Sequence, residues 1–125
     1  MILLLDTHVV LWWLDNPLIL SAEAKNAIAE PSNDVLVSAV SAWEIAIKRA
    51  LGKLTAPTDF EAAILACGFR PLSISITHAK VTENLPNHHR DPFDRMLIAQ
   101  AMTEGATLVT RDDQISKYKV SVITA

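Results

Sequence analysis

Short apolar segments of strand length alternate along the chain with longer segments that carry helix start and stop signals. Residues 2–5 (Ile-Leu-Leu-Leu) form a continuous apolar run, which is typical of a strand buried on both faces of a parallel sheet. Residues 34–37 and 107–110 are predicted as strands of the same kind. Residues 71–76 and 119–123 complete a set of five predicted strands.

Helices are predicted in the intervening segments, at residues 7–14, 22–30, 41–51, 58–68, 77–85 and 91–104. Asp91 is placed as an N-terminal cap before Pro92, and Gly105 as a C-terminal stop. Capping boxes are expected at Ser41–Glu44 and Thr58–Glu61. The alternation of strands and helices predicts a three-layer α/β/α domain over residues 1–125, with a central, mostly parallel sheet.

Acidic residues follow the predicted strands at the points where ligands bind in such sheets. Asp6 ends the first strand, and Asp112 comes just after the strand at residues 107–110. Glu44 and Asp94 are expected in the first turns of helices that begin at the same edge. Because this edge lies at the carboxyl ends of the strands, the four carboxylates are expected to converge there.

Four converging carboxylates require a compensating positive charge or a proton. Each close pair of like charges costs about 4 kcal/mol at 4 Å with an effective dielectric constant near 20. The predicted ligands are all hard oxygen atoms, which favour Mg²⁺ or Mn²⁺ over zinc or copper. A divalent ion held by carboxylates suits the hydrolysis of phosphodiester bonds.

Each acidic residue also has an ordinary structural interpretation. Asp6 could simply end a strand, and Glu44 could serve a capping box and pair with Lys48 four residues later. Asp91 is well explained as a helix cap, and Asp94 suits the positive end of the helix dipole. The metal hypothesis therefore depends on all four side chains meeting at one edge of the sheet.

The histidines and tryptophans are interpreted as mostly structural. His88 and His89 are assigned to a solvated polar loop, although they could approach a substrate, and His78 is expected on the surface. The three tryptophans assigned to the core are Trp12, Trp13 and Trp43. Trp12 and Trp13 are adjacent and cannot share one helix face, so one of these two is expected to face a partner.

Basic residues near the acidic positions are candidates for contact with a phosphate group. They could contact phosphate groups that an acidic pocket would otherwise repel, or they could form an ordinary solvated face. The residues concerned are Lys48, Arg49, Lys53, Arg95 and Arg111.

Composition narrows the functional classes. Eleven basic and fourteen acidic residues give a net charge of −3, which excludes a highly basic protein that coats nucleic acid without regard to sequence. The single cysteine, Cys67, excludes an intramolecular disulfide and a cysteine-rich zinc site. No apolar stretch approaches the roughly 20 residues of a membrane span, so a reduced, cytoplasmic setting is expected. The mean hydropathy of +0.25 points to apolar surface covered by a partner.

Four sequence blocks resemble PIN-domain proteins, and more narrowly the VapC-like toxin ribonucleases of type II toxin–antitoxin pairs. The blocks are LLLDTHVVLWWL, SAVSAWEIAIKRALGKL, HHRDPFDRMLIAQA and ATLVTRDDQISKY. Their order places Asp6, Glu44, Asp94 and Asp112 at the four acidic positions of the family. Asp91 could assist Asp94, and Asp113 could replace Asp112.

The resemblance implies a PIN-like fold and an endoribonuclease that depends on Mg²⁺ or Mn²⁺. It also implies an RNA substrate, a homodimer and a cognate antitoxin protein that blocks the site. Together with the expected convergence of the carboxylates at one edge of the sheet, it predicts Asp6, Glu44, Asp94 and Asp112 as catalytic residues and metal ligands.

Two other functions are considered. A phosphotransfer domain with Asp6 as nucleophile would need a second aspartate at position 8, or a lysine after a late strand, where this chain has His8 and Arg111. A scaffold could bind RNA or protein without cutting, but the presence of all four acidic residues argues against a degenerate site.

Overall fold

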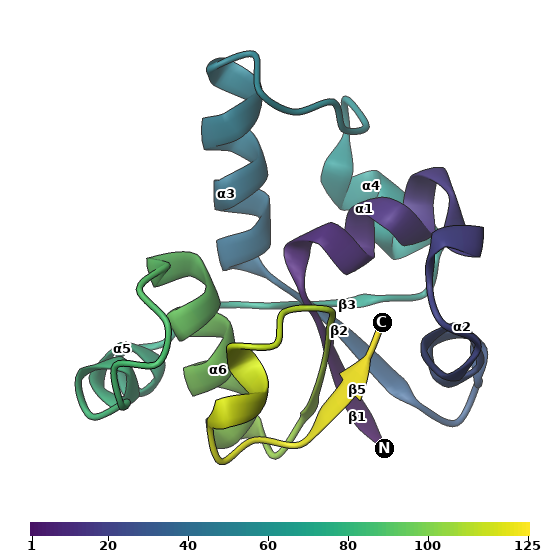
Figure 1. Cartoon of the computed structure of the whole chain (residues 1–125). Coiled ribbons are helices and arrows are strands. Elements are labelled where there is room, and N and C mark those ends of the chain that lie inside the picture. The colour runs from purple at the N-terminus through teal and green to yellow at the C-terminus, as the bar shows by residue number, and fades with distance from the viewer.

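Five strands form the central sheet in the computed structural model, which describes residues 1–125 (Figure 1). The strands are β1 (Ile2–Leu5), β2 (Asp34–Ser38), β3 (Arg70–Leu72), β4 (Thr107–Thr110) and β5 (Val122–Thr124). The α-helices are α1 (Thr7–Asp15), α2 (Ala22–Ala29), α3 (Ala39–Ala50), α4 (Phe60–Ala66), α5 (Ile76–Glu83) and α6 (Pro92–Glu104), and Pro17–Ile19 and Ile115–Lys117 form short 3-10 helices. No helix combines the length and the hydropathy needed to cross a membrane.

All neighbouring strands of the sheet are parallel, in the order β3-β2-β1-β4-β5. Leu4 of β1 is aligned with Leu36 of β2 on one side and with Leu108 of β4 on the other. Strands β2 and β3 therefore lie on one side of β1, and strands β4 and β5, which come later in the chain, lie on its other side. Such a reversal of the strand order leaves a crevice at the carboxyl ends of the two central strands, β1 and β4.

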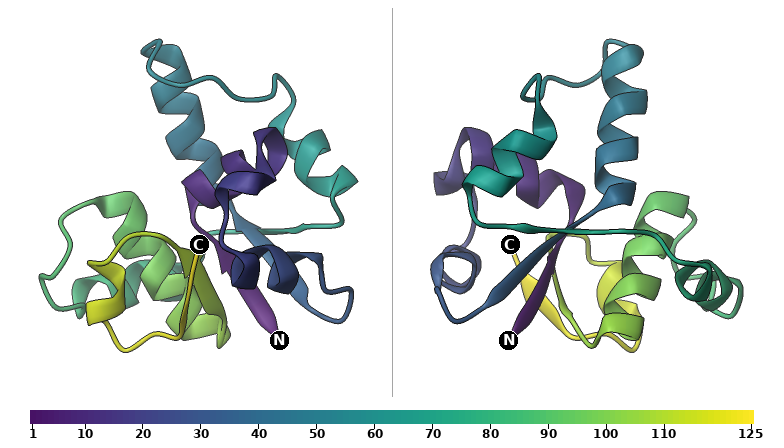
Figure 2. Two further views of the ribbon diagram at one scale, coloured as in Figure 1. Left: turned by 45° about the vertical axis from the view of Figure 1, so that its right-hand side comes forward. Right: turned by 180° about the vertical axis from the view of Figure 1, so that it is seen from behind.

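The two faces of the sheet carry separate hydrophobic cores. Leu3 and Leu5 point into a core shared with α1, α2 and α4, whereas Leu4 points into a second core with α6. Successive side chains of a strand point to opposite faces, so a fully apolar strand can be buried on both sides. Figures 1 and 2 show helices on both faces of the sheet, which confirms the predicted α/β/α architecture.

Helix α3 begins earlier than the sequence predicts, and the expected Ser41–Glu44 capping box is wrong. Ser38, at the end of β2, is the N-terminal cap, and its Oγ accepts a hydrogen bond from the Val40 N–H at 3.0 Å. Ser41 lies inside the helix, where its Oγ accepts a hydrogen bond from Thr7 Oγ1 at 2.9 Å. Glu44 consequently lies in the second turn of α3, not the first.

The second predicted capping box is also wrong. Asp59 caps α4 by accepting a hydrogen bond from the Ala62 N–H at 3.0 Å, so the expected cap at Thr58 is displaced by one residue. Asp is the stronger helix cap of the two residue types, which explains the choice.

Edge strand β3 is shorter than predicted, and edge strand β5 begins and ends later in the chain than predicted. The segment predicted as a strand at residues 71–76 ends at Leu72, because Ser75 and His78 form a capping box that starts α5 at Ile76. His78 is thereby buried, with 3% exposure, and its Nε2 lies 2.9 Å from Glu104 Oε2. The prediction of a surface position for His78 is wrong, because its partner lies on α6.

Candidate active site

Asp6 lies at the end of β1, where the sheet order reverses. Its backbone N–H donates to Val109 O at 3.0 Å, which fixes the carboxyl end of β1 to β4. Its carboxylate is buried and accepts a hydrogen bond from Thr110 Oγ1 at 2.7 Å. Burial raises the pKa of Asp6 above its ordinary value, and the hydrogen bond from Thr110 opposes that shift.

Asp112 lies beside Asp6, two residues beyond the end of β4. Its backbone N–H donates to Thr110 Oγ1 at 3.1 Å, and its Oδ1 accepts from the Gln114 N–H at 2.9 Å. Thr110 therefore uses one hydroxyl to orient the Asp6 carboxylate and to hold the backbone of Asp112. This link brings together two acidic residues that are far apart in sequence.

Glu44 reaches the same region from α3 and is only 4% exposed. Lys48, one turn later, lies with its Nζ 2.6 Å from Glu44 Oε2. The hydrogen bond to Glu44 is the main cause of the raised pKa of Lys48. A buried carboxylate needs such a partner, because an isolated buried charge is strongly unfavourable.

Asp94 is positioned by the start of α6. The Oδ1 atom of Asp91 accepts hydrogen bonds from the Phe93 N–H at 2.8 Å and the Asp94 N–H at 3.3 Å, which confirms Asp91 as the helix cap. Asp94 lies in the first turn of the helix. Burial, together with the negative charges of Asp6 and Asp91, raises the pKa of Asp94 to about 7.

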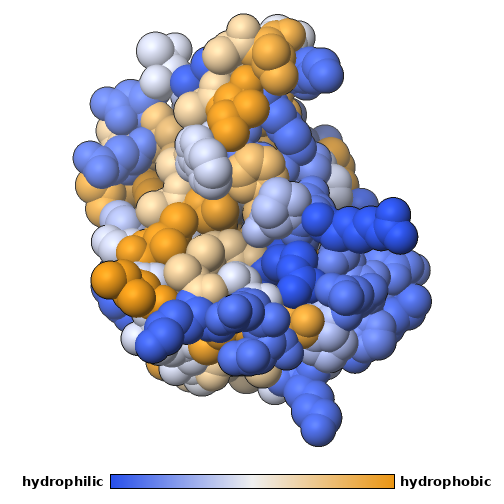
Figure 3. All heavy atoms as spheres, turned by 90° about the vertical axis from the view of Figure 1, so that its left-hand side faces the viewer, coloured by the Kyte–Doolittle hydropathy of each residue, from blue (hydrophilic) through white to orange (hydrophobic).

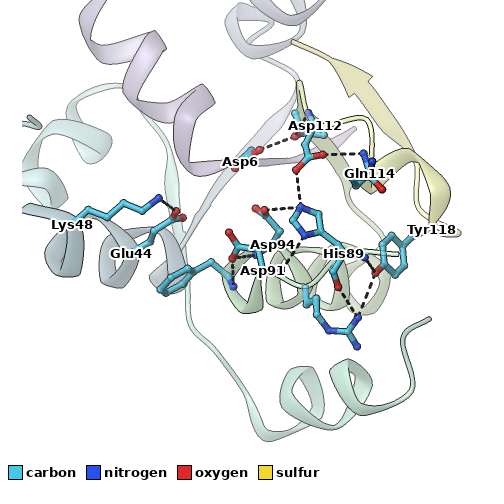
Figure 4. Close-up of polar contacts among 12 residues, drawn as sticks. Asp6, Glu44, Lys48, His89, Asp91, Asp94, Asp112, Gln114 and Tyr118 are labelled. Atoms are coloured by element: carbon cyan, nitrogen blue, oxygen red, sulfur yellow. Dashed lines mark hydrogen bonds and ion pairs between the residues drawn. The ribbon is translucent and has the colours of Figure 1, made fainter. Parts of the chain in front are cut away.

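A cavity of about 180 Å³ receives all of these carboxylates, and Figure 4 shows them approaching it from different elements. It is lined by Asp6, His8, Trp12, Glu44, Lys48, Asp91, Asp94, Arg111 and Asp112. Asp113 is exposed and does not line this cavity. The structure thus brings the four main predicted residues together, and Asp91 with them.

His89 is the residue at this site whose importance the sequence analysis missed. Its Nε2 lies 2.7 Å from Asp112 Oδ2 and 3.0 Å from Asp94 Oδ2, and its side chain is only 15% exposed (Figure 4). The Asp91 N–H donates to Nδ1 at 3.1 Å, so Nε2 is the nitrogen that carries the proton and donates to the carboxylates. The interpretation of His89 as a solvated loop residue is therefore wrong.

The loop that carries His89 is held in place by Tyr118 and Arg95. The His89 N–H donates to the Tyr118 hydroxyl at 2.8 Å, and that hydroxyl donates to Pro86 O at 2.8 Å. Arg95 donates to Pro86 O and to the carbonyl of His89. Arg95 is thus engaged with the backbone of this loop. The position of His89 two residues before the Asp91 cap was the only sequence signal that pointed it toward the site.

The other basic residues near the site divide into two groups. Lys48 and Arg111 line the acidic cavity, and the Arg111 guanidinium also lies 4.4 Å above the Trp12 ring. Arg49 donates to the Pro57 carbonyl, and Lys53 is exposed outside the cavity. Of these four residues, only Lys48 and Arg111 line the cavity, and Arg111 also donates to the Ala125 and Ile19 carbonyls.

The donors at this site fit a hard divalent cation. Ligand atoms of His89, Asp94 and Asp112 lie within 4.8 Å of one another. The cavity adds the carboxylates of Asp6, Glu44 and Asp91 and one further imidazole, that of His8. Burial and the neighbouring carboxylates Asp6 and Asp91 raise the pKa of Asp94, so a cation at this point would relieve the cost of its ionisation. Mg²⁺ and Mn²⁺ accept such oxygen-rich ligand sets, whereas structural zinc sites prefer cysteine and histidine.

Comparison with known proteins identifies the family. Residues 3–120 match the PIN domain. The chain is also 31% identical to Ribonuclease VapC22 of Mycobacterium tuberculosis over 123 residues, which covers 93% of this chain and 91% of the relative. The chain belongs to the PIN-domain family. This agrees with the resemblance in its four sequence blocks.

Solved structures share the fold of this PIN domain at low sequence identity. A chain in the crystal structure of VapBC2 from Rickettsia felis, bound to a DNA fragment from its promoter, matches with a TM-score of 0.73 at 14% identity, over 98% of both chains. A chain of VapBC-5 from Mycobacterium tuberculosis, a member of the VapBC family of toxin–antitoxin systems, matches with a TM-score of 0.61 at 19% identity, over 99% of this PIN domain and 98% of that chain. Both likenesses support the same arrangement of sheet and helices.

Proposed function

We propose that the chain is a metal-dependent endoribonuclease, the toxin of a type II toxin–antitoxin pair, which hydrolyses RNA phosphodiester bonds. The observation that carries the proposal is the meeting of Asp6, Glu44, Asp94 and Asp112 in one cavity of a PIN domain. The name of the relative, a ribonuclease, supports RNA as the substrate.

Asp6, Glu44, Asp94 and Asp112 would hold one or two Mg²⁺ or Mn²⁺ ions in this proposal, directly or through water. A bound divalent ion supplies positive charge that lowers the pKa of an attacking water and stabilises the negative charge of the phosphate. In the hydrolysis itself, the attacking water gives up one proton, and its oxygen forms a bond to phosphorus. The bond from phosphorus to the leaving ribose oxygen breaks, and that oxygen takes up a proton, so that one water is consumed for each bond cut.

Other residues prepare the cavity for this reaction. Thr110 orients the Asp6 carboxylate and fixes the backbone of Asp112. Lys48 and Arg111 place positive charge at the cavity wall, where they would reduce the repulsion between RNA phosphates and the carboxylates. His89 holds the Asp94 and Asp112 carboxylates at a common position through its Nε2.

An antitoxin is the proposed protein partner, and a homodimer the proposed assembly, in a cytoplasmic setting. The fold neighbours are chains of toxin–antitoxin complexes. An apolar cavity of about 480 Å³ adjoins the acidic one, since His8 and Trp12 line both, and Leu11 and Leu14 contribute to its wall. A protein segment seated there would cover apolar surface and close the approach to the carboxylates.

The proposal is tested by incubating a total RNA pool with the purified chain in Mn²⁺, in Mg²⁺ and in EDTA. We expect discrete fragments with the metal ions and none in EDTA. The Asp6→Ala variant should lose the cleavage, whereas Asp113→Ala, which removes an exposed aspartate outside the cavity, should retain it. Equal cleavage by Asp6→Ala, or cleavage that persists in EDTA, would contradict the proposed site.

A further inference from the structure

Trp43 is the one exposed tryptophan, since Trp12 and Trp13 are both half-buried. The ring of Trp12 is covered by the Arg111 guanidinium at 4.4 Å, and Trp13 lies against Phe69 with ring centroids 6.2 Å apart. Trp43 is 59% exposed, and its aromatic neighbour is Phe93, at 5.3 Å in an edge-on arrangement of 74°. The expectation that Trp43 belongs to the core is therefore wrong.

The sequence positions of these two aromatic residues place them beside the candidate active site. Trp43 directly precedes Glu44 in α3, and Phe93 directly precedes Asp94 in α6. Successive residues on a helix point in directions about 100° apart. Glu44 and Asp94 therefore line the acidic cavity, whereas Trp43 and Phe93 line a neighbouring groove.

This neighbouring groove, which we call the aromatic groove, has a volume of about 460 Å³. Trp43, Phe93 and Met96 contribute to its apolar lining, and Arg90 and Arg95 contribute positive charge. Figure 3 views the molecule from the side of α3, α5 and α6, and shows hydrophobic residues gathered between hydrophilic areas of the surface. The groove thus combines an apolar floor with a charged border.

Two arginines supply the positive charge at the groove, and one of them has no partner within the protein. Arg90 is exposed and makes no hydrogen bond or ion pair, whereas Arg95 donates to backbone carbonyls such as Thr82 O and Pro86 O. A free guanidinium beside an open aromatic ring matches the two parts of a nucleotide, the phosphate and the base. Proteins bind single-stranded nucleic acid through this combination of positive charge and stacking platforms.

We propose that the aromatic groove is a nucleobase-stacking subsite for single-stranded RNA. A base next to the scissile phosphate would stack on the Trp43 ring, which packs edge-on with Phe93. Arg90 would contact a flanking phosphate. This inference rests on the proposed ribonuclease function, because it assigns the groove to the same substrate. It adds a determinant of where the RNA strand lies relative to the carboxylates.

The test measures RNA binding by fluorescence anisotropy, in Mn²⁺ and on an Asp94→Asn background that keeps the RNA intact. The probes are a labelled single-stranded oligouridylate and an abasic oligomer of the same length, which has the phosphates but no bases. Trp43→Ala should weaken binding of the oligouridylate about tenfold and leave binding of the abasic oligomer unchanged. Trp43→Phe should restore most of the affinity, and Arg90→Gln should weaken binding of both probes.

Leu18→Ala is the matched control, because Leu18 is an exposed hydrophobic residue, at 81%, in the 3-10 helix Pro17–Ile19 outside the groove. It should bind both oligomers as the background protein does. Sedimentation of the Trp43→Ala variant tests the competing occupant, a second copy of the chain. A dimer that dissociates on this substitution, with unchanged affinity for the oligouridylate, would overturn the stacking subsite.

The failure of this inference can be separated from the failure of the proposed function. If the wild-type chain cuts the RNA pool in a metal-dependent way but Trp43→Ala binds the oligouridylate as tightly as its background, the subsite is wrong and the ribonuclease proposal stands. If the wild-type chain neither cuts the pool nor binds the oligouridylate, both are overturned.

Discussion

At the scale of single residues, Asp94 is the carboxylate in the cavity whose ionisation is most strongly affected by its surroundings. It shares that cavity with four other carboxylates, and its pKa is raised to about 7 by burial, Asp6 and Asp91. The positive end of α6 and the Nε2 proton of His89 act in the opposite direction. The structure thus keeps an acidic group where its ionisation is unfavourable without a cation, which is common at functional sites.

We expect Asp94→Asn to stabilise the metal-free chain at neutral and higher pH. The pKa of Asp94 rises from an ordinary 3.8 to about 7 on folding, so its ionisation costs nothing below the lower value and opposes folding fully above the higher one. After allowance for solvent screening, the gain should be roughly 1–2 kcal/mol at about pH 8 and should nearly vanish at about pH 4. Urea unfolding in EDTA at the two pH values measures it.

Asp113→Asn provides the control for this prediction, since Asp113 is exposed and outside the cavity. Its effect on the free energy of unfolding should be small at both pH values. A gain from Asp94→Asn that is the same at both pH values would contradict the assigned ionisation.

At the scale of elements, the start of α6 serves both the fold and the site. Asp91 caps the helix, Pro92 occupies its first position, and Asp94 lies in its first turn. The same capping residue uses its backbone N–H to orient His89. The local sequence Asp-Pro-Phe-Asp therefore sets where Asp94 and His89 lie.

The two functions available to Asp91, helix cap and metal ligand, can be separated by substitution. Asparagine caps a helix about as well as aspartate, so Asp91→Asn should leave the stability nearly unchanged, whereas Asp91→Ala should lose about 1 kcal/mol in urea unfolding. If capping is the main role, Asp91→Asn should also bind Mn²⁺ nearly as tightly as the wild-type chain in calorimetric titration. Loss of Mn²⁺ affinity comparable to that of Asp94→Asn would instead make Asp91 a ligand.

At the scale of the whole molecule, the order of the strands creates the site. Because β1 and β4 are neighbours with parallel directions, the residues that follow them, Asp6 and Asp112, meet at one edge of the sheet. Helices α3 and α6 then add Glu44 and Asp94 from elsewhere in the chain. A cation bound at this point would bridge elements that span most of the sequence.

Binding of Mn²⁺ should therefore stabilise the entire fold. A ligand that binds only the folded state adds about 2.7 kcal/mol when its concentration is 100 times its dissociation constant. We expect the midpoint of thermal unfolding to rise with the logarithm of the Mn²⁺ concentration, and Asp6→Asn to reduce this rise strongly. Asp113→Asn should keep the wild-type response, and a rise of equal size in Asp6→Asn would exclude Asp6 as a ligand.

Local signals in the sequence were sufficient for the framework of the fold. The bounds of β1 and β4 and the bounds, cap and stop of α6 follow from neighbouring residues, and the structure confirms them. The start of α3 was misplaced, because Ser38 and Ser41 are both good caps and the choice depends on Thr7, which binds Ser41 across the fold. Edge strand β3 was overextended because the capping box of Ser75 and His78, which starts α5 at Ile76, was not recognised.

The sequence by itself determined the alternation of strands and helices and the acidic residue after each central strand, because these depend on hydrophobic periodicity and on caps a few residues apart. Only the tertiary structure decided the surroundings of those residues. His89 acquires its role from Asp112, 23 residues away, and the exposed Trp43 finds its aromatic neighbour, Phe93, on another helix. Such contacts between distant segments depend on how the helices pack on the sheet, and no local pattern encodes them.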